Sequence, residues 1–209
     1  MKNRSIILII LTFTLLLLVS CGKAEKSGPE ASADAFLQGI KQGDTKAIGK
    51  VYAGEDFDLD ESFASIEALA GSVEGGQEAM DTLLTKLQDF DYKITGSEID
   101  GDKATVDVEI TTYDFGGMMT DFLTDYLIES STMTLKGESS EEMKKAAVKL
   151  FTEALDSLTE KDREGEAALH LTKTGDTWKV DALAPDSDFL NVLSGGLSQS
   201  VLDLSEMID

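Results

Sequence analysis

The sequence predicts an α+β fold in which N-terminal helices pack on a curved antiparallel sheet. Apolar residues recur at helical spacing from Pro29 onward, and they alternate with polar residues over 104–110. Over 166–171, Ala167, Leu169 and Leu171 alternate with Glu166, Ala168 and His170. Between these alternating stretches the helical spacing returns. Alternation gives a strand one apolar and one polar face, which is typical of an antiparallel sheet covered on one side.

Two helices are expected at the start of this fold. Proline suits the first helical turn, so the first helix begins at Pro29. Gly43 ends it, and Asp44 caps the second helix, which ends before Gly54. The predicted inward positions are Ala33, Phe36, Leu37 and Ile40, then Ala47, Ile48, Val51 and Tyr52.

Two more helices are expected before the first strand. One starts near Asp60 and the other near Gln77, with a glycine-containing loop over 71–76 between them. A strand then follows and turns at Asp100 and Gly101, a dipeptide favoured in hairpins. The predicted inward positions of these segments are Phe63, Ile66, Met80, Leu83, Leu84, Leu87, Tyr92, Ile94, Ile99, Ala104, Val106, Val108 and Ile110.

A helical insertion over about 116–160 is expected to follow Gly116 and Gly117. Two strands then return, with inward residues from Ala167 to Ala182, and Pro185 ends the last strand. A final helix carries Phe189, Leu190 and Leu193 and is weakened at Gly195 and Gly196. Residues 30–209 are therefore predicted to form a single α+β domain.

Residues 1–20 are predicted to be a secretory signal peptide. Lys2 and Arg4 precede an apolar run over 6–19 that is interrupted only by Thr12 and Thr14. As a helix this run spans about 21 Å, which is shorter than the hydrocarbon layer of roughly 30 Å that a membrane-spanning helix must cross.

Leu18, Val19, Ser20 and Cys21 directly follow the apolar run, and their order resembles the lipobox of bacterial lipoproteins. The resemblance implies that Cys21 becomes the first residue of the mature chain and carries the lipid, palmitate included. Two or more acyl chains anchor a protein stably. Residues 21–29 would then be a lipidated tether, and the protein would lie outside the cytoplasm on the membrane of a bacterial envelope.

The order of elements resembles the cystatin-like or NTF2-like fold found in small bacterial lipoproteins. The residues that carry this resemblance are Ala35-Phe36-Leu37, Gly43-Asp44 and Val51-Tyr52 of the helical hairpin, and Thr177-Trp178-Lys179-Val180 of the closing strand. The resemblance implies a sheet curled around helices, with a pocket used by enzymes, ligand carriers or docking proteins. The insertion over 116–160 departs from this pattern and could fill or cover the pocket.

Charge excludes one class of function. The chain has 40 acidic and 18 basic residues and a net charge of −22. Such a surface repels phosphate backbones, so we expect no nucleic-acid partner.

Two groups of residues resemble parts of metal or catalytic sites. Asp56, Asp58, Asp60 and Glu67 have the spacing of a calcium loop, but Glu61 stands where that loop needs glycine. A solvated acidic helix start is the favoured interpretation, and calcium binding is left open. His170 is the only histidine; zinc needs three or four such ligands, so no metal site is predicted and His170 is expected on the exposed sheet face.

A ligand pocket is predicted within the insertion. Its candidate residues are Tyr113, Met118, Phe122 and Tyr126. Methionine adapts to varied apolar shapes, although an ordinary core explains the same residues, and Gly116-Gly117 in front of them could act as a hinge.

The preferred hypothesis is a lipid-anchored, extracytoplasmic, non-catalytic protein that binds a small ligand or an envelope protein, without a cofactor. The first alternative is an NTF2-like enzyme that uses Asp, Glu or Tyr113 as acid or base. The second is a structural or interaction protein that acts through its sheet face. A homodimer is compatible with each of them. The sequence does not reveal the ligand, the pathway or the type of envelope.

Overall fold

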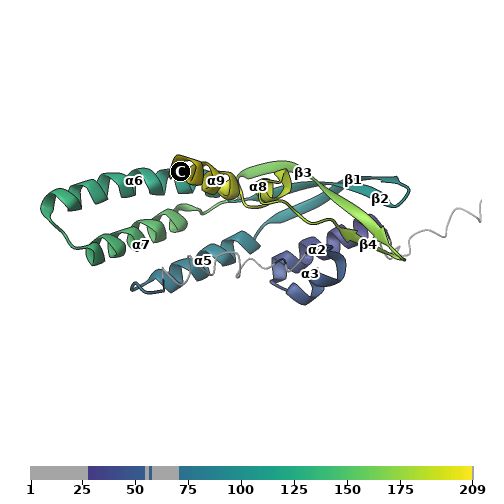
Figure 1. Ribbon diagram of the computed structural model, residues 1–209, viewed down its shortest axis with the longest axis horizontal. Coiled ribbons are helices and arrows are strands. Elements are labelled where there is room, and N and C mark those ends of the chain that lie inside the picture. Colours follow the sequence, from purple (N-terminus) through teal and green to yellow (C-terminus); the bar gives the residue numbers. More distant parts are fainter. Residues whose placement is uncertain (1–27, 55–56, 58–70, 209) are drawn as a thin grey trace, which may run out of the picture.

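The computed structural model describes residues 28–54, 57 and 71–208. The signal segment, Cys21, the helix expected from Asp60 and the calcium-like pattern from Asp56 to Glu67 lie outside these residues, except for Phe57. Figure 1 shows an elongated molecule with a sheet at one end and a long helical hairpin at the other. The chain is therefore an α+β protein.

An open sheet of four antiparallel strands forms one half of the molecule. Its strands are β1 (Asp91–Asp100), β2 (Lys103–Thr112), β3 (Arg163–Thr174) and β4 (Thr177–Val180), in the order β1-β2-β3-β4. A bulge interrupts β1 between Ile94 and Gly96. The predicted alternation is confirmed for β2 and β3, because Val106, Val108 and Leu169 are fully buried whereas His170 is exposed. Ile99 was expected to face inward, but it is exposed at the end of β1, beyond the part of the strand that faces α2.

Helix α2 (Pro29–Gln42) covers the apolar face of this sheet, followed by α3 (Thr45–Val51). Gly43 ends α2 in the left-handed conformation, and the carboxylate of Asp44 accepts a hydrogen bond from the Ala47 amide at 3.0 Å. Both predicted helix boundaries are confirmed. The aromatic rings of Phe36, Tyr52 and Phe189 pack together in this first core.

The other half of the molecule is helical. The insertion between β2 and β3 forms α6 (Phe115–Lys136) and α7 (Ser140–Ser157), which lie side by side, with α5 (Gly76–Gln88) against α7. Ser139 and Glu142 form a capping box at the start of α7. A second apolar core lies among these helices and is centred on Met80, Phe115 and Leu155.

The C-terminal segment corrects two expectations. β4 ends at Val180 rather than continuing to Ala182, which is exposed; the Val180 carbonyl instead accepts a hydrogen bond from the Ala53 amide. The expected final helix is two helices, α8 (Asp188–Leu193) on the sheet and α9 (Leu197–Ile208) against α6. Gly195 and Gly196, both with positive φ, separate them. Within the described ranges, no helix has the length and apolar character needed to span a bilayer.

Candidate apolar ligand site

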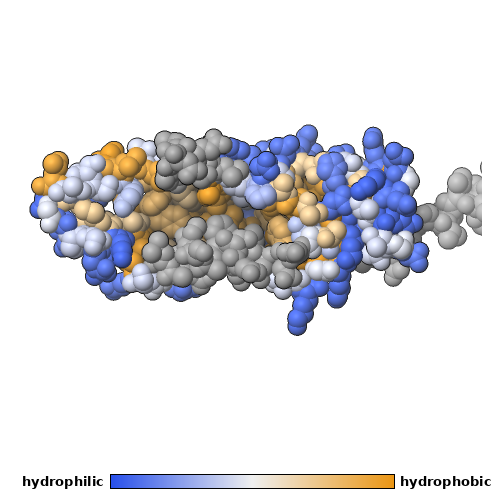
Figure 2. Space-filling view, in the orientation of Figure 1, coloured by the Kyte–Doolittle hydropathy of each residue, from blue (hydrophilic) through white to orange (hydrophobic). Residues whose placement is uncertain are grey.

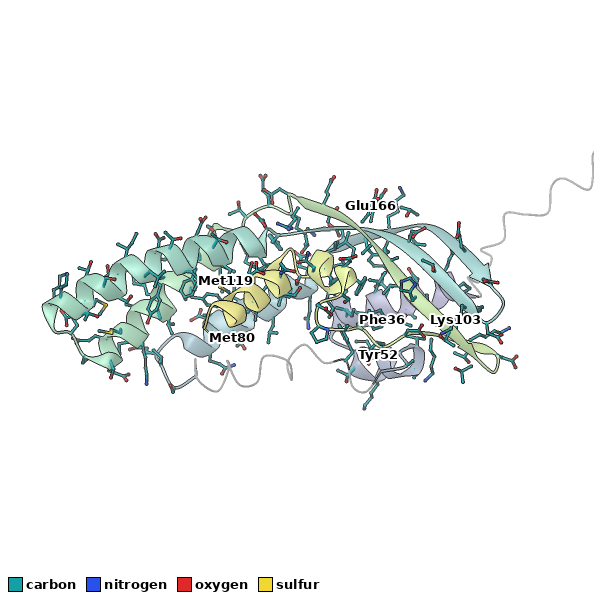
Figure 3. The ribbon with its side chains drawn as sticks, turned by 45° about the horizontal axis from the view of Figure 1, so that its top comes forward. Phe36, Tyr52, Met80, Lys103, Met119 and Glu166 are labelled. Atoms are coloured by element: carbon teal, nitrogen blue, oxygen red, sulfur yellow. The ribbon has the colours of Figure 1, made fainter. Side chains whose placement is uncertain are left out.

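The helical half contains a cavity of about 340 Å³ between α5, α6, α7 and α9. Figure 2 shows apolar residues gathered in a hollow along this half of the molecule, and Figure 3 shows Met80 of α5 and Met119 of α6 beside α9. The lining residues are Val73, Gly76, Ala79, Met80, Leu83, Met119, Phe122, Lys144, Ala147, Val148, Phe151, Leu197 and Val201.

Helical periodicity places these side chains on the cavity wall. Helix α7 contributes four of them, at i, i+3, i+4 and i+7 from Lys144, and these positions share one face of a helix. Several wall positions are small: Gly76, Ala79 and Ala147. Small side chains leave part of the space between the helices unfilled, so the cavity lies where the side chains of the second core have the least volume.

The cavity wall is apolar at almost every position. None of the described residues that line it carries a carboxylate, and Lys144 is its single charged residue. Lys144 is exposed, whereas Ala79, Met80, Leu83 and Leu197 are buried. The wall can therefore hold an apolar group by burial. Lys144 contributes the methylene groups of its side chain to this wall, and the residue is exposed to solvent.

The four predicted pocket residues lie in different places. Phe122 lines the cavity, and the ring of Tyr126 stacks on it with centroids 6.0 Å apart. Met118 is buried in the second core, outside the cavity lining. Tyr113 lies at the junction of the two halves, where its hydroxyl donates a hydrogen bond to Asp89 at 2.9 Å.

Most of the wall comes from residues that sequence reasoning assigned to core or did not single out. Met80 and Leu83 have core-like helical spacing, and Leu197 and Val201 belong to a helix that was not predicted. Their periodicity marks them as inward-facing, but it does not reveal which four helices meet or that the packing leaves a space.

The expected hinge at Gly116 and Gly117 is instead part of the first turn of α6. The Gly117 amide donates to the Asp114 carboxylate at 3.2 Å, which caps the helix. The Gly116 amide donates to the Gly195 carbonyl at 2.9 Å. Gly116 therefore lets the chain before α9 cross closely over the start of α6, where a Cβ atom would lie 3.2 Å from the Gly196 carbonyl oxygen.

A charged network joins the two halves of the molecule. The ammonium of Lys161 lies 3.0 Å from the Asp89 carboxylate and 2.7 Å from that of Asp91. The hydrogen bond that Lys161 donates to Asp89 is the main cause that lowers the pKa of Asp89, and its second hydrogen bond, to Asp91, is the main cause that lowers the pKa of Asp91. The hydrogen bond to Asp89 and partial burial raise the pKa of Tyr113.

The outer face of the sheet is polar. A groove of about 620 Å³ extends over β1, β2 and β3 to α8 and includes Asp107, Glu109, Glu166 and Asp188. Glu166 points away from α2 in Figure 3. His170 lies on this face, with its Nδ1 atom 3.3 Å from the Thr105 hydroxyl. In the part of the chain that the structure describes, no three histidine, cysteine or acidic side chains converge as metal ligands.

Comparison with known proteins adds little. No protein-family model matches the sequence, and no curated protein matches it significantly. Among solved structures, a candidate lipoprotein (ycdA) of Bacillus subtilis subsp. subtilis str. 168 is similar, with 16% sequence identity and a TM-score of 0.40. The match covers 91% of this chain and 54% of that one, so the chain spans about half the length of the solved structure. A TM-score this low supports no conclusion about fold or function.

Proposed function

We propose that this protein is a lipid-anchored, extracytoplasmic binding protein that holds an apolar ligand in its helical half. The observation that carries the proposal is the cavity between α5, α6, α7 and α9, with its nearly uncharged wall. Its volume of about 340 Å³ lies within the range of roughly 300–1,000 Å³ found for ligand pockets.

The cavity favours binding over catalysis. Acid–base chemistry needs a titratable group within reach of the substrate, and Lys144 is the single such group in the described lining. Tyr113, which the enzyme hypothesis would use, is held by Asp89 at the junction of the halves. The enzyme hypothesis therefore receives less support than the binding hypothesis.

The sheet face supports a docking role less well than the cavity supports binding. Asp107, Glu109 and Glu166 place negative charge on this face. The centres of protein–protein interfaces are instead depleted of charged residues. The arrangement of α2 across four antiparallel strands supports a cystatin-like fold.

Residues 1–21 support the lipid anchor, through the apolar run and the lipobox pattern that ends at Cys21. The tether would join the folded part at Pro29. The neighbouring Glu30 accepts a hydrogen bond from Ser97 of β1 at 2.7 Å, which places the start of α2 at the sheet end of the molecule. The α6–α7 turn lies at the other end (Figure 1), so we expect the cavity to be held away from the anchor.

Photoaffinity labelling tests the binding proposal. The probe is decanol with a diazirine in its chain, offered to the full chain in phosphatidylcholine nanodiscs, with labelled peptides identified by mass spectrometry. We expect labelling on α5, α6, α7 and α9 that untagged decanol competes away. Ala147→Phe should fill the cavity and reduce labelling at least tenfold, whereas Ala146→Phe, beside it but outside the lining, should not.

Labelling spread evenly over the surface, or unchanged by Ala147→Phe, would contradict the binding proposal. Intact-mass measurement tests the anchor separately: the membrane-bound protein should carry acyl groups on Cys21, and Cys21→Ala should release none of its signal peptide and carry no lipid. An unmodified Cys21 in the native protein would contradict the anchor and leave the cavity proposal standing.

A further inference from the structure

We propose that the ligand is an anionic amphiphile, whose hydrocarbon chain fills the cavity and whose carboxylate or phosphate head is bound by Lys144. This inference rests on the proposed binding function and names the chemical class of the ligand. It follows from the position of Lys144, the one charged residue of the lining, at the rim of an apolar wall.

Lys144 has no acidic partner in the described part of the chain. No ion pair within 4.0 Å or hydrogen bond joins its ammonium to another described residue. Some other lysines do have such partners: on the same helix, Lys149 lies 3.6 Å from Glu153, and Lys161 binds both Asp89 and Asp91. Lys145 makes no ion pair with a described residue either, but unlike Lys144 it does not line the cavity. In a chain with 40 acidic residues, an unpaired ammonium beside a cavity is available for an external anion.

The start of α5 adds positive potential at the same end of the cavity. Gly76, its first residue, lines the cavity, and a Cβ atom built on Gly75 would lie 3.7 Å from the side chain of Val148, one turn after Lys144. The residue before α5 is Gly75, which has no side chain to cap the helix, and the first turn of a helix carries partial positive charge. The Gly76 amide already donates to the Val73 carbonyl at 3.0 Å. Glu78 in the first turn offsets part of this charge.

The two features define an orientation for the ligand. An anionic head would sit near Lys144 and the start of α5, and the chain would run inward between Met80 and Met119 toward Leu197. A cationic head would instead be repelled by Lys144, and an uncharged head would gain nothing from it. The head group should therefore decide affinity among molecules with the same chain.

Competition among matched head groups tests this inference. Decanoate, decanol and decylammonium, each below its aggregation concentration, compete with the diazirine probe for the full chain in phosphatidylcholine nanodiscs, and empty nanodiscs correct for partitioning into lipid. Decanoate should compete best and decylammonium worst. Across octanoate, decanoate and dodecanoate, competition should strengthen about fourfold per methylene until the cavity is full.

Variants of one residue isolate the role of the ammonium. Lys144→Gln should weaken decanoate competition roughly three- to tenfold, the range for an exposed charge-assisted contact, and should weaken decanol competition less, because decanol loses only contact with the lysine methylene groups. Lys144→Glu should reverse the order of decanoate and decylammonium. Lys145→Gln is the matched control, because it removes the same charge from the next residue, which is outside the cavity lining.

Comparing a lysophosphatidylglycerol that has a ten-carbon chain with decanoate identifies the source of the ligand. Stronger competition by the lysophosphatidylglycerol would indicate a membrane lipid, and stronger competition by decanoate would indicate a free fatty acid. Equal competition by the three head groups, or equal effects of Lys144→Gln and Lys145→Gln, would overturn the inference while the binding proposal stands. Failure of the decanol probe to label the cavity would instead overturn the binding proposal.

Discussion

At the scale of single residues, Gly195 allows the segment between α8 and α9 to pack closely against the start of α6. Gly195 has a φ of +54°, which places it in the left-handed region, and its carbonyl accepts the hydrogen bond from Gly116. A Cβ atom at Gly195 would collide with the carbonyl oxygen of Tyr113. Glycine is therefore required here for two independent reasons, the backbone conformation and the close crossing of two segments.

Gly195→Ala should destabilise the protein by more than about 2 kcal/mol, because the left-handed conformation alone costs an alanine roughly 1–2 kcal/mol and the collision adds to it. Gly49→Ala is the matched control: Gly49 lies within α3, a Cβ there meets no atom within 4 Å, and its φ is not positive. That change should stabilise by about 0.5–1 kcal/mol. Urea unfolding followed by circular dichroism measures both, and equal effects would contradict this account of Gly195.

The charged network of Lys161, Asp89, Asp91 and Tyr113 lies at the junction of the two halves and joins residues from several loops. Asp89 ends α5, Tyr113 lies between β2 and α6, and Lys161 lies between α7 and β3. The ammonium of Lys86 contributes as well, since it donates to the Leu158 carbonyl at 2.6 Å and lies 4.7 Å from the centre of the Tyr113 ring. The network thus fixes the ends of the helical elements to the sheet.

The lowered pKa of Asp89 predicts how this network responds to acid. The unfolded carboxyl titrates near 3.9 and the folded one lower, so its ionised form stabilises the fold above the unfolded value and this contribution is lost as the pH falls through the folded pKa. Asp89→Asn should therefore reduce stability at pH 7, and its difference from the native protein should shrink below about pH 4.

Urea unfolding at a series of pH values measures this difference. Asp100→Asn is the control, because Asp100 is exposed at the β1–β2 turn and makes no ion pair with a described residue. A deficit for Asp89→Asn that stays constant from pH 7 to pH 3 would show that the carboxylate charge is not what stabilises the junction.

Sequence patterns predicted the elements well and their extent less well. The start of α2 at Pro29, the cap at Asp44 and the inward strand positions are local properties, which propensity and periodicity determine. Two predictions were wrong: that the last strand continues to Ala182, and that a single helix follows it in place of α8 and α9. Both depend on contacts distant in sequence: Val180 with Ala53, and Gly195 with Gly116.

The molecule is elongated (Figure 1), and the full chain is strongly acidic, with a net charge of −22. Like charges repel one another in the compact state, and salt weakens this repulsion by shortening the screening length from about 30 Å at 0.01 M to about 8 Å at 0.15 M. The surface ion pairs, such as Lys93 with Glu109 at 3.3 Å, are weakened too, but exposed pairs contribute little.

The midpoint of thermal unfolding should therefore rise by a few degrees between 0.01 M and 0.15 M KCl, because relief of repulsion exceeds the loss of ion pairs. Circular dichroism in a chelator-containing buffer measures it, and tetramethylammonium chloride at the same ionic strength controls for specific ion binding. A midpoint that falls with salt would mean that the ion pairs dominate the electrostatics of the fold.

The sequence by itself determined the α+β class, the two-helix insertion, the exposed place of His170 and the lipobox pattern at Cys21, because each is written in local spacing or composition. The tertiary structure alone decided where the cavity lies. Its wall comes from four helices between Gly76 and Val201, and a space between helices depends on how their faces meet, which periodicity does not specify. The same reason explains why Phe122 lines the cavity whereas Met118, one turn away, fills the core beside it.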